Sequence, residues 1–261
     1  MVRESEENGI RSVQRALSIL LCFSWEQQEM SLIEICKKIS LPKSTTSRLL
    51  ATLENEGFLE RNYVTKKYKL GPKLYYLGLV ARQGLDLRNV ALPIMKELRE
   101  TTRETVNLYV KEGEQRVCFE QVESPLSLKR SAKIGDRFPL WAGASGKSFL
   151  AYMDAEDVAK IMETARSLTK NTIVDKEMMQ KELEKIRRQG YAVSIEEREQ
   201  GVSAVASPVF DVSGKMIASL SVSGPSFRFT EDKIKQFGCQ VKEAATAISR
   251  KLGYICPDNH N

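Results

Sequence analysis

The sequence predicts an α+β protein with an N-terminal winged helix-turn-helix and a larger C-terminal domain built on a mainly antiparallel sheet. Helix-start signals at Ser31 and Pro42 open two short helical stretches, and a basic hairpin pattern follows them. From Thr105 onward the apolar spacing changes from helical to alternating. We expect the four parts of the chain at 1–73 (DNA-binding domain), 74–100 (helical linker), 101–254 (second domain) and 255–261 (polar tail).

Composition places the chain among ordinary globular proteins, with 42% hydrophobic and 28% charged residues. No run approaches the roughly 18 apolar residues that a membrane span needs. The acidic N-terminus, with Glu4, Glu6 and Glu7, does not fit a secretory signal. Five cysteines without C-x-x-C spacing argue against both a disulfide framework and a zinc ribbon. We therefore expect a cytoplasmic protein with no membrane partner, reduced cysteines in its core, and no metal or cofactor.

The positive charge is concentrated in one segment. Residues 37–73 contain nine basic and three acidic side chains, so they carry the whole net charge of +6. A basic patch of this kind suits a polyanionic partner such as nucleic acid, although a solvated basic face is an equally ordinary interpretation. The charge alone does not decide between the two.

Two helical segments precede the turn of the predicted helix-turn-helix. Residues 13–23 are rich in apolar side chains, which predicts a mostly buried helix. Ser31 with Glu34 forms a capping-box pattern, and the stretch that follows has the apolar spacing of an amphipathic helix. Ser40-Leu41-Pro42 ends this second helix.

A third helix is expected from Pro42 to Glu56, with Gly57 as its C-cap. Its core face consists of Thr46, Leu49, Leu50 and Leu53. At about 100° per residue, the opposite face presents Ser44, Arg48, Ala51 and Asn55, with Thr45 and Ser47 beside them. Small hydroxyl residues around one arginine are typical of a recognition helix that enters the major groove.

A hairpin follows the third helix. Leu59, residues 61–63 and residues 67–70 alternate like two strands around a turn that contains Thr65 and Lys66. The plain alternative is a small helical bundle with a hairpin. The capping box, the helix spacing, the basic hairpin and the localised charge together favour a winged helix-turn-helix.

The linker is expected to be helical in two stretches, 74–85 and from Asp86 onward, with Pro93 kinking or dividing the second. It would either set the spacing of two DNA-binding heads or act as a simple connector. In the second domain the pattern predicts strands and helices in mixed order. We expect strands at 106–110, 117–122, 191–195, 203–210 and 215–222, and helices at 146–153, 155–165, 175–189 and 231–252.

The segment 141–148 superficially resembles a phosphate-binding loop. It lacks the required first glycine, because Trp141 occupies that position. A glycine-rich turn before a helix still offers backbone N–H groups to a carboxylate or phosphate, although the glycines can also serve a tight turn alone. Catalysis is not indicated, since the only histidine, His260, lies in the polar tail, and the charge run 196–199 is more typical of a solvated turn. We expect no catalytic residues.

Several short blocks of the sequence follow one family pattern. In the N-terminal part they are 15–17, 41–45 and 48–53. In the C-terminal part they are Gly135, 139–140, 146–147, 190–193, Glu197, 201–202, 206–209 and 221–225. On these blocks the chain resembles the IclR family of bacterial transcription regulators from about Arg11 to Tyr254. Each block is weak alone, and their order and spacing make the match specific.

The resemblance implies a winged helix-turn-helix joined to a GAF-like effector domain, assembled as a homodimer or homotetramer on double-stranded operator DNA. Most family members repress catabolic genes, and many respond to a small organic acid. DNA contacts are then expected from Arg11, Arg15, Lys43, Ser44, Thr45, Ser47, Arg48, Lys66 and Lys67. Effector contacts are expected from Leu140, Gly143, Ala144, Ser194, Glu197, Val202, Ala204, Ser221 and Ser223.

Three positions depart from the family pattern around the expected effector site. Ser194 and Ala204 stand where some members have an acidic residue and a cysteine, and Trp141 is bulkier than usual. The ligand therefore differs from those of such members. The competing hypotheses are a second domain that only oligomerises and, more remotely, an enzyme.

Overall fold

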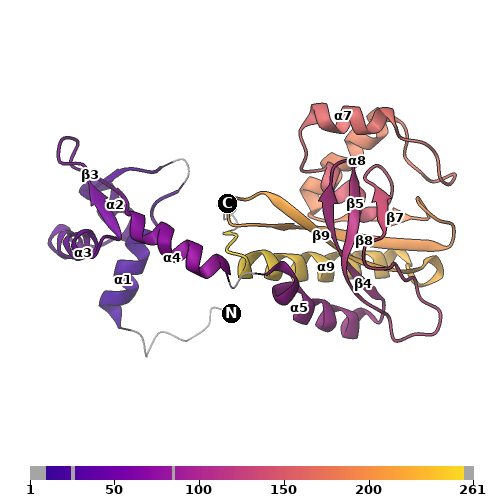
Figure 1. Cartoon of the computed structure of the whole chain (residues 1–261), viewed down its shortest axis with the longest axis horizontal. Helices are drawn as coiled ribbons and strands as arrows, with labels where there is room; N and C mark the ends of the chain where they lie inside the picture. The colour runs from indigo at the N-terminus through magenta and orange to yellow at the C-terminus, as the bar shows by residue number, and fades with distance from the viewer. Residues whose placement is uncertain (1–9, 25–26, 84–85, 256–261) are drawn as a thin grey trace. The chain divides into compact units, whose positions relative to one another are not determined.

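The computed structural model describes residues 10–24, 27–83 and 86–255, which form two compact units, 1–84 and 85–261 (Figure 1). The acidic N-terminus, Cys256 and the polar tail with His260 lie outside the described residues. No helix in these described ranges is long and apolar enough to cross a membrane.

The N-terminal unit is a helix-turn-helix with a small antiparallel sheet in the order β1-β3-β2. The capping box predicted at Ser31 is present: the Ser31 N–H donates to the Glu34 carboxylate at 2.7 Å, and the Glu34 N–H donates to Ser31 Oγ. The core gathers apolar side chains from all three helices and the sheet, including Ile19, Ile35 and Leu50. The elements are α1 (Arg11–Leu20), β1 (Met30–Ser31), α2 (Leu32–Ile39), α3 (Lys43–Asn55), β2 (Leu59–Arg61), β3 (Lys67–Leu70) and α4 (Pro72–Gln83).

The first helix differs from its prediction. It begins and ends earlier than 13–23, and only Ile19 is fully buried. Val13 and Leu17 are 51% and 54% exposed. A helix packed on one side of a small unit can bury only one stripe of its surface, so the apolar residues outside that stripe remain uncovered.

The C-terminal unit is built on a six-stranded sheet in the order β6-β5-β4-β9-β8-β7, with every neighbouring pair antiparallel. The strand β6 was not predicted, because three residues that include Pro139 carry no readable alternation. The elements are α5 (Leu87–Thr102), β4 (Thr105–Glu112), β5 (Gln115–Val122), β6 (Arg137–Pro139), α6 (Ala144–Leu150), α7 (Ala155–Glu163), α8 (Lys176–Gln189), β7 (Ala192–Ile195), β8 (Val202–Phe210), β9 (Met216–Pro225), a short 3-10 turn (Ser226–Arg228) and α9 (Glu231–Lys251).

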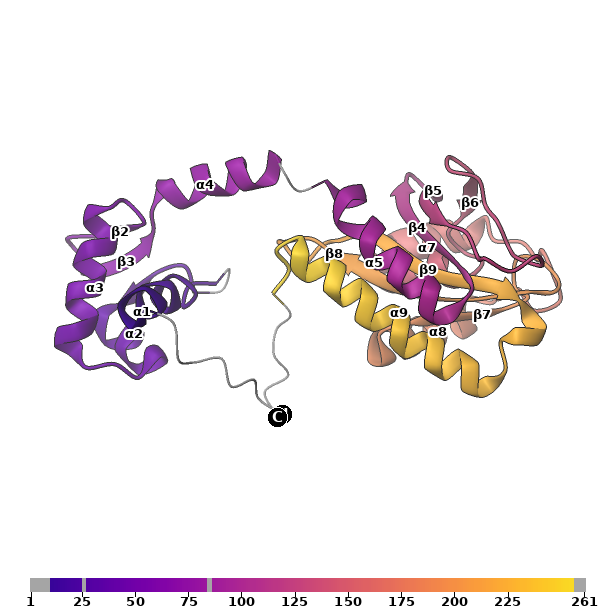
Figure 2. The same ribbon diagram turned by 90° about the horizontal axis from the view of Figure 1, so that it is seen from below.

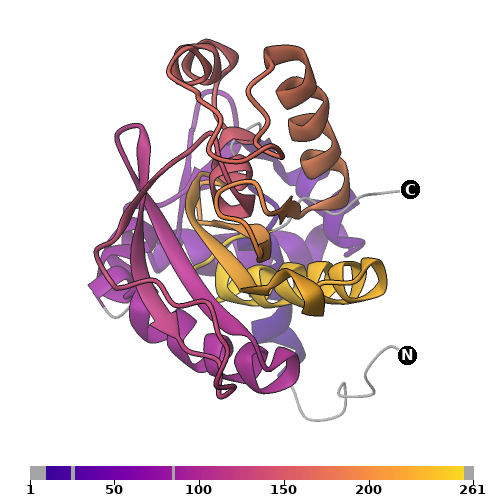
Figure 3. The same ribbon diagram turned by 90° about the vertical axis from the view of Figure 1, so that its right-hand side faces the viewer.

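Helices cover both faces of this sheet (Figures 1 and 3). On one face, α5 and α9 lie side by side, as the view in Figure 2 shows, and bury a core that includes Leu108, Val222 and Val241. On the other face, α6 contacts β8 and β9, and α7 and α8 join it around Leu140, Phe149 and Leu183. A cavity lined by residues of α6 and the sheet lies on this second face.

The expected linker is corrected by the packing of α5. This helix runs without interruption through Pro93, so the proline does not divide it. Ala91, Ile94 and Met95 are buried in the core of the C-terminal unit. Arg88 also forms an ion pair with Glu120 of β5 at 2.5 Å. Residues 87–102 therefore belong to the second domain, and only α4 remains as a candidate connector.

Candidate functional site

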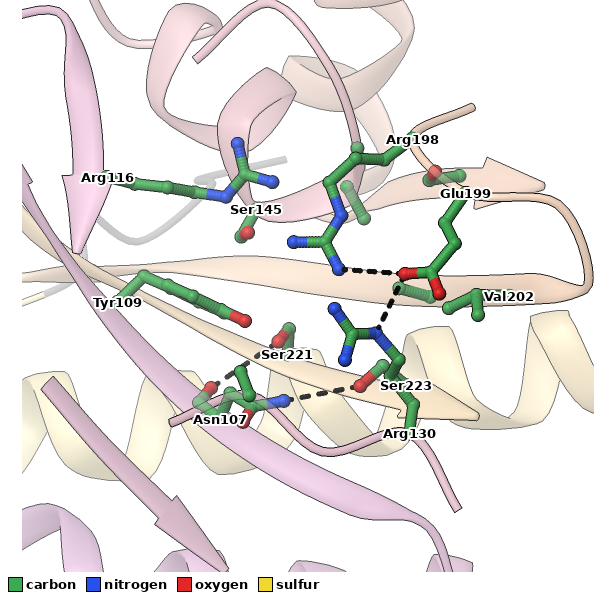
Figure 4. A pocket seen from close by; sticks show the side chains of 15 residues that line it. Asn107, Tyr109, Arg116, Arg130, Ser145, Arg198, Glu199, Val202, Ser221 and Ser223 are labelled. Carbon is green, nitrogen blue, oxygen red and sulfur yellow. Dashed lines mark hydrogen bonds and ion pairs between the residues drawn. The ribbon is translucent and has the colours of Figure 1, made fainter. Parts of the chain in front are cut away.

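A small, partly open cavity lies between the sheet and the start of α6 (Figure 4). Its walls come from β4, β5, β7, β8 and β9, from α6, and from the loops around residues 130 and 198. Three arginines and one carboxylate are among the residues that line it. The lining residues are Asn107, Tyr109, Arg116, Arg130, Ala132, Gly143, Ala144, Ser145, Ser194, Arg198, Glu199, Val202, Ala204, Ser221 and Ser223.

Arg116 of β5 is the most deeply buried cation in the cavity wall, at 2% exposure. Its guanidinium lies 5.6 Å from the ring centre of Tyr109 and 5.5 Å from that of Phe138, and it donates to the Pro139 carbonyl. Its Nε is buried and has no hydrogen-bond partner. Burial lowers the pKa of Arg116 to about 9, so the side chain is still charged at neutral pH.

The glycine-rich turn predicted before α6 has a role that the sequence did not show. A Cβ on Gly146 would lie 2.6 Å from the Arg116 guanidinium and would also overlap the Leu140 carbonyl. A Cβ on Gly143 would lie 3.1 Å from the same guanidinium, and Gly143 has a φ of +87°. The glycines therefore make room for Arg116 beside the turn.

The expected carboxylate seat at the start of α6 is filled by the protein itself. The Gly143 N–H donates to Glu197 at 3.3 Å, and Glu197 forms an ion pair with Lys147 at 2.5 Å. Lys147, only 1% exposed, also contacts Glu182 of α8 at 2.9 Å. Burial raises the pKa of Glu197 above its ordinary value, and Lys147 acts in the opposite direction. The prediction of a solvated turn at 196–199 is therefore wrong for Glu197, which fastens this loop to α6.

Two further arginines, Arg130 and Arg198, reach the cavity from loops (Figure 4). Arg130 Nε lies 3.3 Å and Arg198 lies 3.8 Å from the same carboxylate, that of Glu199. The Arg198 guanidinium also stacks 4.1 Å from the centre of the Phe138 ring. Burial is the main cause that lowers the pKa of Arg198, and the positive charge of Arg130 adds to it. One carboxylate thus serves two guanidinium groups.

The floor of the cavity carries a short hydrogen-bonded group on β4 and β9. Asn107 donates through Nδ2 to Ser223 Oγ at 3.2 Å, and Ser221 Oγ donates to the Asn107 carbonyl at 3.5 Å. The Asn107 Oδ1 atom is buried without a partner. Ser221 and Ser223 are two residues apart on one strand, so both point toward the cavity as the sequence predicted.

The structure brings together seven of the nine residues predicted for the effector site: Gly143, Ala144, Ser194, Val202, Ala204, Ser221 and Ser223. Leu140 and Glu197 do not line the cavity; Leu140 is packed in the core, and Glu197 is turned toward Lys147. Sequence reasoning missed the three arginines, together with Asn107 and Tyr109. Alternation shows which strand face Asn107, Tyr109 and Arg116 occupy on β4 and β5, but it does not show that the two strands border a cavity, and Arg130 and Arg198 lie in loops that carry no such pattern.

The residues predicted to contact DNA lie on the N-terminal unit. Ser44, Ser47 and Arg48 are exposed on α3, and Thr45 is half-buried. Thr46 points inward and donates to the Pro42 carbonyl at 3.1 Å, as expected for the core face. Arg11 and Arg15 on α1, and Lys43 at the start of α3, are exposed as well. The recognition face predicted from helical periodicity is therefore open to a ligand.

Of the lysines in and just after the hairpin, some are paired with carboxylates and others are not. Lys69 pairs with Glu60 at 2.9 Å, and Lys73 lies 3.9 Å from Glu56. Lys66, with a φ of +59° at the turn, and Lys67 have no carboxylate within 4 Å in the described part of the chain. The charge at the tip of the hairpin is thus available to phosphates.

Both units match models of one protein family. Residues 12–62 match the IclR helix-turn-helix domain, and residues 80–250 match the bacterial transcriptional regulator IclR C-terminal domain. The chain belongs to the IclR family. Its members, including the relatives below, are transcriptional regulators and not enzymes.

Two curated relatives and one solved structure match nearly the whole of this IclR-family chain. The HTH-type transcriptional regulator KdgR of Escherichia coli is 33% identical over 253 residues, covering 96% of each chain. The HTH-type transcriptional repressor AllR of Salmonella typhi is 32% identical and covers 96% of this chain and 93% of its own. The crystal structure of an IclR transcriptional regulator from Silicibacter sp. has a TM-score of 0.86 and 26% identity, covering 94% of this chain and 97% of that one.

Proposed function

We propose that this DNA-binding regulator represses a catabolic operon and that a small organic acid in the C-terminal cavity controls its binding to operator DNA. Two buried polar atoms in the cavity wall support the effector part of this proposal. They are a guanidinium nitrogen of Arg116 and the Asn107 Oδ1 atom, and neither has a hydrogen-bond partner. Buried polar groups are normally hydrogen-bonded, so unpartnered ones facing a cavity point to a ligand. We place this activity in the cytoplasm.

The DNA-binding part of the proposal assigns α3 to the major groove and the β2–β3 hairpin to the adjacent phosphates. Arg48, exposed on α3, suits a bidentate contact with guanine, and Ser44 and Ser47 let the helix backbone approach closely. We further propose a homodimer or homotetramer. Support comes from exposed apolar side chains on α1 (Val13, Leu17) and α4 (Tyr75, Tyr76), which suit burial between copies.

Removing a single hairpin charge should reveal the phosphate contacts. With Lys66→Ala, operator affinity should fall to a similar extent for all sequences, and the slope of log K against log salt should flatten by about 1 unit, because one fewer counterion is released. Fluorescence anisotropy at four salt concentrations measures the slope. Lys69→Ala is the matched control, since Lys69 is already paired with Glu60. Equal slopes for Lys66→Ala and the parent protein would remove the hairpin from the DNA interface.

Two serines on strand β9 test where the effector binds. The double variant Ser221→Ala/Ser223→Ala should need about 5- to 150-fold more organic acid to change operator binding, because each of the two lost hydrogen bonds is worth about 0.5–1.5 kcal/mol. DNA affinity without acid should stay unchanged. Ser219→Ala is the control, since Ser219 lies on the same face of β9 but outside the cavity lining.

The measurement is a gel-shift titration of operator complex with a panel of small organic acids. A regulator whose second domain only oligomerises would show no response to any acid, and that result would refute effector control. A response that the double serine variant leaves unaltered would place the effector elsewhere.

A further inference from the structure

We propose that the cavity selects a ligand with two negatively charged groups, such as a dicarboxylate or a phosphorylated acid, with Arg116 binding one group and Arg130 and Arg198 the other. This inference rests on the proposed effector function and narrows its chemistry. It follows from the charges of the lining residues, from the pairing state of each arginine and from the separate elements that bring the arginines to one cavity (Figure 4).

The charges that line the cavity do not balance. Three guanidinium groups face one carboxylate, that of Glu199, so the lining carries a net charge of +2. Behind the wall, Lys147 pairs with both Glu197 and Glu182, so this cluster adds a net charge of −1 outside the lining, and the lining itself keeps its charge of +2. Three cations held close together raise the electrostatic energy of the empty site, and two negative charges from a ligand would neutralise the lining.

Arg116 provides the first binding position. No carboxylate lies within 4 Å of its guanidinium among the residues that the structure describes. Glu197 acts on this guanidinium only at longer range, and a buried charge that lacks a paired carboxylate is costly, so a ligand anion would stabilise Arg116. The rings of Tyr109 and Phe138 hold the guanidinium by stacking and leave its Nε–H free to donate.

Arg130 and Arg198 provide the second position. Both use the same Glu199 carboxylate, whose side chain is 54% exposed, and Asp136 acts on Arg198 only at longer range, so no second carboxylate pairs directly with these two guanidinium groups among the described residues. Arg198 is held over the Phe138 ring and cannot move far from the cavity without losing that contact. A second anionic group of the ligand would bind here, beside Glu199 or in its place.

A monocarboxylate or an uncharged ligand leaves part of this arrangement unused. One negative charge neutralises only half of the +2 charge that the lining residues carry. Charge-assisted hydrogen bonds to guanidinium are roughly twice as strong as neutral ones. The difference between a doubly and a singly charged ligand of the same size should therefore be large.

The test compares matched ligands by titration calorimetry with the full-length protein. One arm uses succinate against succinamate, in which an amide replaces one carboxylate. The other arm uses 3-phosphoglycerate against glycerate. In at least one arm the ligand with two anionic groups should bind about tenfold tighter or more than its counterpart with one anionic group. The arm that shows the difference tells whether the second group is a carboxylate or a phosphate.

Variants identify the residues that carry the preference. Arg116→Gln and Arg198→Gln should each reduce the dianion preference to less than about threefold, because each removes one of the two positions. Arg137→Gln is the control, since Arg137 is exposed on the neighbouring β6 and pairs with Glu112 at 2.6 Å. If Arg116→Gln fails to fold, as judged by circular dichroism, the result with Arg198→Gln decides.

The outcomes separate this inference from the proposed function. Singly charged acids that bind as tightly as their doubly charged partners, and still release operator DNA, would overturn the dianion preference and leave effector control intact. A preference that survives in both arginine variants would overturn the assignment of the two positions. Failure of every acid to bind or to affect operator binding would refute both proposals.

Discussion

Replacing Lys147 with methionine should lower the free energy of unfolding of the C-terminal domain by about 3–5 kcal/mol. The substitution leaves Glu197 buried without its cation, and Glu182 loses the same contact. The Glu197 carboxylate also accepts the Gly143 N–H, so the loop after β7 and the start of α6 should loosen together. Thermal or urea unfolding monitored by circular dichroism measures the loss.

Two comparisons make the Lys147 experiment specific. Lys176→Met removes the same side chain from an exposed pair with Glu163 at 3.8 Å, and it should change stability by less than about 1 kcal/mol. Adding Glu197→Gln to Lys147→Met should recover part of the loss, because it removes the uncompensated charge. A Lys147→Met protein as stable as the parent would mean that the buried pair contributes nothing to the fold.

Replacing Gly146 with alanine should distort the cavity and abolish the response to acid. The new methyl group would meet the Leu140 carbonyl and would lie 2.6 Å from Arg116, so the guanidinium or the turn must move. Overpacking of this kind costs about 1–3 kcal/mol in a well-packed region. The expected result is a lower unfolding midpoint together with loss of acid-dependent release of operator DNA.

The same helix supplies the control for Gly146→Ala. Ser148 lies two residues further along α6, is fully buried, and its Oγ has no hydrogen-bond partner. Ser148→Ala removes an unsatisfied hydroxyl and should leave stability unchanged or slightly improved. If Gly146→Ala behaves like Ser148→Ala in both assays, the close packing of Arg116 against the turn does not matter for function.

Local signals were sufficient to predict most elements of the fold. The capping box at Ser31 and the cap at Asp175 mark helix starts because a side chain there satisfies backbone N–H groups within the same few residues. Alternation predicted β4, β5, β7, β8 and β9 to within a few residues. These signals succeed because the interactions that cause them join residues close in sequence. The α+β class follows from the order of the elements.

Local signals failed where packing between distant elements decides the outcome. Periodicity showed α5 as an amphipathic helix but not that its partner would be α9 of its own domain. The helix α1 has more apolar residues than the small N-terminal core can cover, so its composition predicted more burial than the structure shows. The short edge strand β6 exists only because β5 offers it a pairing partner.

For the candidate site, the sequence by itself determined the recognition helix, the basic hairpin and the two serines that face one way on β9. Helical and strand periodicity fix the direction of a side chain within its own element. The three arginines come from separate elements, and only the folded sheet brings them to one cavity. The burial of Lys147 and the reason for Gly146 were likewise decided by tertiary structure, because each depends on a side chain that is distant in the sequence: Glu197 for the lysine and Arg116 for the glycine.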